Sequence, residues 1–133
     1  MKKNILKVVA AVLACMMLIG CGTTNLETIM NTSAAKAEID KVREDLLAQY
    51  GEVYSDYSLE VKENDLIYNY YYTADYDADM LASIKEALEA DTSWSDTIEG
   101  VKNEIEQSSK IRPNSVTFAY YSADGEEVFK VTE

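Results

Sequence analysis

The chain lacks histidine altogether and contains only five glycines, two cysteines and one proline among its 133 residues. Without histidine there is no Ser-His-Asp or Cys-His nucleophile system, no imidazole general base and no histidine-bearing zinc site. No G-x-G-x-x-G, Walker-type or G-x-S-x-G sequence occurs, and so few glycines leave little room for a phosphate-binding loop. From the sequence we therefore assign no catalytic residue, no metal ligand and no cofactor.

The N-terminus has the charge pattern of an export signal. Three lysines lie within the first seven residues, and a stretch without charge follows from Val8 to Cys21. A positive segment followed by a short apolar one is typical of a signal peptide. The apolar run ends at Ile19, which makes it shorter than the roughly 20 residues that a membrane-spanning helix needs. We interpret residues 1–20 as a signal peptide.

The residues at the end of this segment, Leu18-Ile19-Gly20-Cys21, resemble the lipobox of bacterial lipoproteins. The resemblance implies cleavage between Gly20 and Cys21 and a diacylglyceryl group on the Cys21 thiol. The alternatives are an ordinary secretory signal with an incidental cysteine, or an uncleaved anchor helix. An ordinary signal prefers an A-x-A-like site, which is absent near residues 18–22. We therefore expect an extracytoplasmic protein that is anchored to the bacterial cell membrane by lipid.

Thiols and charge limit what the mature chain can do. Cys15 lies in the segment to be removed and Cys21 would carry lipid, so no thiol remains for a disulfide or a metal. Loss of the three signal lysines lowers the formal net charge from −12 to −15. Such a surface is repelled by nucleic acid and by anionic headgroups. We expect membrane contact through the lipid and no nucleic-acid partner.

Composition divides the remaining chain into a tether and one domain. Residues 21–33 are mostly small and polar, as in a flexible tether. Leu26, Ile29 and Met30 interrupt this composition and could instead begin a helical turn that docks on the domain. Residues 34–133 have the length of a single domain.

Hydrophobic periodicity predicts helices and hairpins in alternation. Apolar residues at three- and four-residue spacing indicate helices over 39–50, 81–88 and 94–105. Thr32 or Ser33 could cap the first of these helices, and Gly51 could end it. Alternating runs over 57–62, 66–73, 115–121 and 127–132 indicate two hairpins. The order α-β-β-α-α-β-β predicts an α+β fold, an antiparallel sheet of about four strands with helices on one face. The second and third helices could be separate or form one kinked helix.

The chain resembles a family of small lipoproteins from Gram-positive Firmicutes that carry a domain of unknown function. The likeness covers most of residues 26–133. It rests on the lipobox, on residues 64–70, on the helical stretch 81–88 and on residues 116–129 with their Ala123-Asp124-Gly125 turn. The resemblance implies the location and the fold, and it implies no catalytic residue.

Acidic residues offer two further hypotheses, and each has a simpler alternative. Glu126 and Glu127 beside Asp124 could form a carboxylate pair for acid–base catalysis, but with 24 acids some pair is always close. Residues 75–86 imitate the acidic positions of a calcium loop, yet the sixth position is methionine where that loop needs glycine. We expect instead that Asp77 and Asp79 lie at a helix N-terminus, where negative charge is favourable.

Tyrosine is the most informative abundant residue, because all ten tyrosines fall in the regions 50–76 and 120–121. Alternation places Tyr68, Tyr70 and Tyr72 on one strand face and Tyr71 on the other. One interpretation is that tyrosine simply favours strands and packs half-buried under helices. The other is an exposed aromatic patch that binds a partner, formed if helices cover only one face. The candidate binding residues are Tyr68, Tyr70, Tyr71, Tyr72, Tyr120 and Tyr121.

By elimination, the sequence favours a non-catalytic, membrane-anchored binding domain whose partner is an envelope protein or a glycan. Two alternatives stay open. One is a carboxylate-dependent envelope enzyme, which needs a concave pocket with two converging carboxyl groups. The other is an inhibitor-like or structural envelope component that docks on one partner.

Overall fold

In a computed structural model of the chain, residues 25–133 are described. The predicted signal peptide, its cleavage site at Gly20 and Cys21, and the lipid attachment at Cys21 lie outside these residues. The helices are α2 (Leu26–Met30), α3 (Ser33–Tyr50), α4 (Ala78–Ala90) and α5 (Trp94–Ser109). The strands are β1 (Tyr54–Lys62), β2 (Asp65–Tyr72), β3 (Ser115–Tyr121) and β4 (Glu127–Thr132). No helix in this described part is long and apolar enough to cross a membrane.

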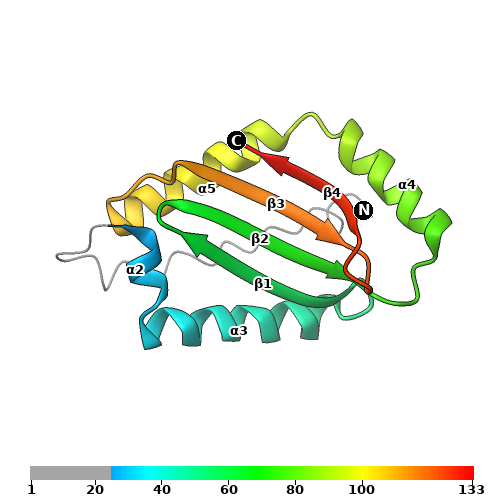
Figure 1. The fold of residues 1–133 in the computed structure, drawn as a ribbon, viewed down its shortest axis with the longest axis horizontal. Coiled ribbons are helices and arrows are strands. Elements are labelled where there is room, and N and C mark those ends of the chain that lie inside the picture. Colours follow the sequence, from blue (N-terminus) through cyan, green and yellow to red (C-terminus); the bar gives the residue numbers. More distant parts are fainter. Residues whose placement is uncertain (1–24) are drawn as a thin grey trace.

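The four strands form one sheet in the order β1-β2-β3-β4 (Figure 1). The α+β class, the element order and the two antiparallel hairpins are confirmed. The sheet is mixed, however, rather than antiparallel throughout, because β2 and β3 pair in parallel from Asp65↔Ser115 to Tyr71↔Tyr121. Helices α4 and α5 carry the chain back to the starting end of β2, and such a crossover is what a parallel pair requires.

The helices cover one face of the sheet, which we call the core face. Helix α3 packs against β1, α5 against β3 and α4 against β4. Figure 1 looks onto the opposite face, which we call the open face, with α5 behind the strands. The single tryptophan, Trp94, joins the layers: its indole Nε1 donates to the Leu88 carbonyl at 2.9 Å, and its ring contacts Phe118, Tyr120 and Phe129.

Local hydrogen bonds explain where the helices begin and end. Thr32 caps α3 by accepting the Ala35 N–H, and Asp77 caps α4 by accepting the Met80 N–H at 2.9 Å. The helix-cap interpretation of the aspartates is thus confirmed. Asp91 takes an extended conformation after α4, so α4 and α5 are two helices.

Helix α2 belongs to the domain core. Leu26, Ile29 and Met30 are buried, with exposed fractions of 1, 0 and 6 %, because their spacing places all three on one side of a helical turn. The Leu26 N–H donates to Asn64 Oδ1 at 2.9 Å, at the turn between β1 and β2. The folded unit therefore starts near residue 26, ahead of the residue 34 that composition indicated.

Candidate functional site

The six candidate tyrosines divide between the two faces of the sheet. Tyr71 and Tyr121 lie on the open face and are half-buried. The other four point to the core face and are at most 1 % exposed. These four are Tyr68, Tyr70, Tyr72 and Tyr120. Strand alternation causes the division, and it leaves two of the six side chains within reach of a partner on the open face.

The core-face tyrosines form a stacked aromatic layer under the helices. Tyr70 stacks on Tyr120 and Tyr68 stacks on Phe118, each with ring centroids 5.0 Å apart. Burial raises the pKa of four phenols above their ordinary value of 10, which keeps them neutral. These four are Tyr57, Tyr68, Tyr72 and Tyr120. Burial shows that the four core-face candidates, Tyr68, Tyr70, Tyr72 and Tyr120, contribute to stability, so their prediction as binding residues is wrong.

Tyr71 and Tyr121 form a stacked pair on the open face. They are direct partners in the parallel register, with ring centroids 5.1 Å apart and ring planes inclined by 22°. Asp56 on β1 is the register partner of Tyr71, and Glu127 on β4 is the partner of Tyr121. A row of Asp56, Tyr71, Tyr121 and Glu127 therefore crosses all four strands, and we call it the tyrosine row. Offset or tilted aromatic pairs of this kind give a rigid apolar surface.

The carboxylates of the tyrosine row are positioned by cations. Arg43 on α3 donates from Nε to Asp56 Oδ1 at 2.7 Å. Lys130 Nζ lies 3.6 Å from Glu127 Oε1. All four of these side chains are about half exposed, so solvent screens both pairs and each contributes little to stability.

Beside the tyrosine row, the open face carries several polar groups that are hydrogen-bonded to one another. The Asn69 amide, only 4 % exposed, donates to Ser58 Oγ at 3.2 Å and to Glu60 Oε2 at 3.0 Å. The hydroxyls of Thr117 and Thr132 pair at 2.8 Å. The two tyrosine rings are therefore the main apolar contact area of the open face where β2 and β3 end.

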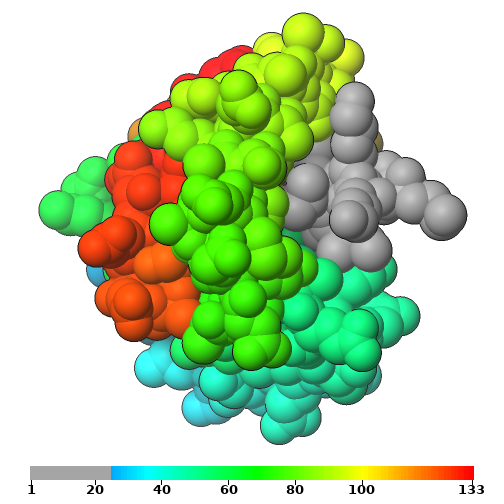
Figure 2. Space-filling model, turned by 90° about the vertical axis from the view of Figure 1, so that its right-hand side faces the viewer, coloured from blue at the N-terminus to red at the C-terminus, as the bar shows by residue number. Residues whose placement is uncertain are grey.

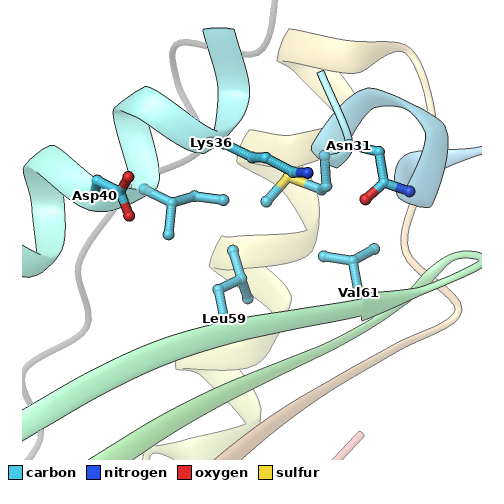
Figure 3. A pocket seen from close by; sticks show the side chains of 7 residues that line it. Asn31, Lys36, Asp40, Leu59 and Val61 are labelled. Carbon is cyan, nitrogen blue, oxygen red and sulfur yellow. The ribbon is translucent and has the colours of Figure 1, made fainter. Parts of the chain in front are cut away.

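Two pockets elsewhere on the described surface each have one carboxylate in their lining. One, of about 300 Å³, lies where Leu59 and Val61 of β1 face Asn31, Lys36 and Asp40 on the helical side (Figure 3). Met30 and Ile39 complete its lining. The other, of about 440 Å³, is lined by Asn103, Glu106, Gln107 and Lys110. Neither contains the two carboxyl groups that glycosidase-type hydrolysis requires.

The remaining carboxylate hypotheses concern the turn between β3 and β4. Asp124, Glu126 and Glu127 are exposed there, and the Glu126 N–H donates to Ser122 Oγ at 3.1 Å. Gly125 has a φ of +92°, the left-handed conformation that favours glycine. Within residues 25–133, no group of three or more acidic side chains is arranged to hold a metal ion.

The fold and its surface define a small α+β domain with one helix-covered sheet face and one open face that carries a stacked tyrosine pair. Comparison with protein families places the chain in a particular family. It belongs to the family described as Domain of unknown function (DUF4854), whose model matches residues 26–132. The match starts at the first residue of α2, in agreement with the position of that helix in the core. No curated protein and no solved structure showed significant similarity to the chain.

Sequence reasoning identified both open-face tyrosines but missed their partnership with Asp56. The partnership depends on the register of β1 against β2, which sets Asp56 opposite Tyr71 next to a β-bulge. A bulge shifts the faces of the residues around it. Alternation read from the sequence carries no signal for such a shift.

Proposed function

We propose that this protein is a lipoprotein of Gram-positive Firmicutes, held outside the cytoplasmic membrane by lipid on Cys21. In this proposal its domain is a non-catalytic binding module. The tyrosine row on the open face contacts an envelope partner, a protein or a glycan. The observation that carries the proposal is the stacked pair Tyr71 and Tyr121 on the sheet face that none of the helices α2 to α5 covers.

The anchor hypothesis is supported by the lipobox-like residues 18–21 and by charge. The chain has a formal net charge of −12 even with its signal lysines, so electrostatic attraction to anionic lipid cannot hold it at a membrane. A diacylglyceryl group supplies two acyl chains, and stable anchoring takes two such signals.

The binding hypothesis is supported by what the tyrosine row offers. Tyrosine presents a large contact area at a small cost in side-chain entropy, because it has only two χ angles. Aromatic residues are also enriched at interfaces. The hydrogen-bonded amides and hydroxyls beside the row hold their positions before a partner arrives, and such preorganisation reduces the entropic cost of association.

The anchor is tested by Cys21→Ala. Metabolic fatty-acid labelling should disappear in this variant, and the protein should be released or accumulate as an uncleaved precursor. A Cys15→Ala variant is the matched control and should be labelled like the natural chain. Full labelling of the Cys21 variant would contradict the proposed anchor.

Binding is tested with the mature lipoprotein in neutral-detergent micelles, mixed with isolated envelope fractions. The double variant Tyr71→Ser/Tyr121→Ser should sediment with the envelope at least about 10-fold less than the natural protein, since each lost anchor side chain costs about 1 kcal/mol or more. Ala82→Ser, an exposed change on α4 away from the open face, is the control and should bind normally. Equal sedimentation of the double variant and the control would refute the assignment of the binding face.

A further inference from the structure

The end of the sheet that carries the tyrosine row has an unusual charge. Three chain segments, residues 49–56, 71–80 and 121–128, meet where β2 and β3 finish; Figure 2 looks at this end. Their contact is fixed by the pairing of Asp56 with Tyr71, of Tyr71 with Tyr121, and of Thr73 N–H with the Val53 carbonyl at 2.9 Å. The three segments contain eight acidic residues and no lysine or arginine. We call this region the acidic end.

The opposite end of the sheet carries cations and helix α2, the first folded element after residue 25. Lys62 and Lys110 lie at that end, and Arg112 is there in ion pairs with Glu99 and Glu106. Opposite charges thus compensate one another where β2 begins. At the acidic end two neighbouring cations are close: Arg43 is already paired with Asp56 and Lys130 with Glu127, which leaves the other six carboxylates to set the charge.

Helix α2 fixes which end faces the membrane. The Glu27 N–H donates to the Glu63 carbonyl at 2.9 Å, and the Glu63 N–H donates to Glu27 Oε1 at 2.8 Å. Five residues from Cys21 to Leu26 reach at most about 18 Å, so a lipid on Cys21 keeps the turn between β1 and β2 near the bilayer. The tyrosine row lies about 20 Å further along β2. Anionic headgroups would also repel the acidic end, which therefore faces away from the membrane.

We propose that the acidic end, with Tyr71 and Tyr121 at its centre, docks a positively charged polypeptide segment of an envelope protein. This inference rests on the proposed function and names the class of its partner. Charge complementarity carries it: lysine and arginine side chains are attracted both to the face of a tyrosine ring and to surrounding carboxylates. Met80 is the one large apolar side chain that is exposed in the described part, at 45 %, and it lies on the adjoining first turn of α4.

The partner chemistry follows from the same residues. A neutral glycan would use the ring faces and could donate hydroxyl hydrogen bonds, but it would gain no charge–charge attraction from the eight carboxylates. A membrane surface would be repelled by them. A basic segment uses both the ring faces and the carboxylates.

The test measures fluorescence anisotropy of an arginine–glycine repeat peptide with the mature lipoprotein in neutral-detergent micelles. Tyr71→Ser/Tyr121→Ser changes no charge and should raise the Kd about 10-fold, because two cation–π contacts are lost. Tyr71→Phe/Tyr121→Phe keeps both rings and should leave the Kd within about twofold. A glutamate–glycine peptide should not bind.

Charge is tested separately with two triple variants that change the net charge equally. Asp124→Asn/Glu126→Gln/Glu127→Gln acts at the acidic end, whereas Glu86→Gln/Glu89→Gln/Glu104→Gln acts on the exposed sides of α4 and α5. The first should weaken peptide binding at least about fivefold more than the second and should flatten its salt dependence.

Unchanged binding in the serine variant, or equal losses in the two triple variants, would overturn the inference. If envelope sedimentation depends on the tyrosines while the arginine peptide does not bind, the binding function stands and the basic partner is refuted. If neither assay depends on the tyrosines, both proposals fail.

Discussion

Removal of helix α2 provides a sharp test of where the domain begins. A chain that starts at residue 34 lacks Leu26, Ile29 and Met30, which are buried against the sheet and α3. It also lacks the hydrogen bonds between α2 and the turn at Glu63 and Asn64. We expect such a chain to be strongly destabilised relative to one that starts at residue 22.

The size of the loss follows from burial. Each fully buried apolar side chain contributes about 1.5–3 kcal/mol, so the three together contribute roughly 4–9 kcal/mol, an upper estimate because the unfolded chain is partly compact. Domains of this size are stable by about 5–15 kcal/mol. The shortened chain should therefore lose about a third or more of its unfolding free energy. Ile29→Ala alone should cost about 2–5 kcal/mol.

Urea denaturation followed by Trp94 fluorescence measures these losses, because Trp94 is the only tryptophan and is 5 % exposed. Glu44→Ala, an exposed change on α3, is the control and should fall within about 0.5 kcal/mol of the natural chain. A chain from residue 34 that retains its unfolding free energy to within about 1 kcal/mol would refute the placement of α2 in the core.

Three further predictions concern the tyrosine layer and the end of α3. Burial raises the pKa of four phenols, so above pH 10 the unfolded chain loses protons that the folded chain keeps. Urea denaturation should therefore show the unfolding free energy falling by about 1.4 kcal/mol per pH unit for each phenol. A constant unfolding free energy through this pH range would contradict the raised pKa values. The buried Tyr120 hydroxyl has no hydrogen-bond partner among residues 25–133, so Tyr120→Phe should keep or raise the unfolding free energy, by up to about 1–3 kcal/mol. A marked loss in the same denaturation assay would argue against this. A Cβ at Gly51 would lie 2.5 Å from the Leu47 carbonyl oxygen, so Gly51→Ala should lower the unfolding free energy by about 1–3 kcal/mol. Thermal melting would detect this loss as a lower melting temperature, and an unchanged melting temperature would contradict the prediction.

Local patterns in the sequence predicted most of the secondary structure. Alternation in residues 66–72 placed Tyr68, Tyr70 and Tyr72 on one face, and the structure buries all three. The Asp77 cap was predictable as well, because capping depends on residues only three positions apart. Helix and strand periods are local properties, so a single sequence carries them.

The parallel pairing of β2 with β3 was not predictable in the same way. It depends on how α4 and α5 pack within residues 73–114, which separate the two strands. Two hairpins can join in either direction. The pairing of Tyr71 with Tyr121 follows from that register. The candidate site therefore became a defined row only when the long-range arrangement of the strands was known.

The role of α2 escaped composition analysis for a related reason. Three apolar residues among small polar ones are too few to establish a helical period. What stabilises the helix is tertiary: its apolar side rests on the core and its N-terminus on the β1–β2 turn. Isolated helices of five residues are not stable in water.

Site-specific photocrosslinking in living cells tests the central claim, that the open sheet face binds an envelope partner, most directly. A photoreactive amino acid would replace Tyr71 or Tyr121 in turn, and Ala82, exposed on α4, would serve as the control position. The account predicts the same crosslinked species from positions 71 and 121 and none from position 82. A species that forms equally from position 82, or no species from either tyrosine position, would contradict it.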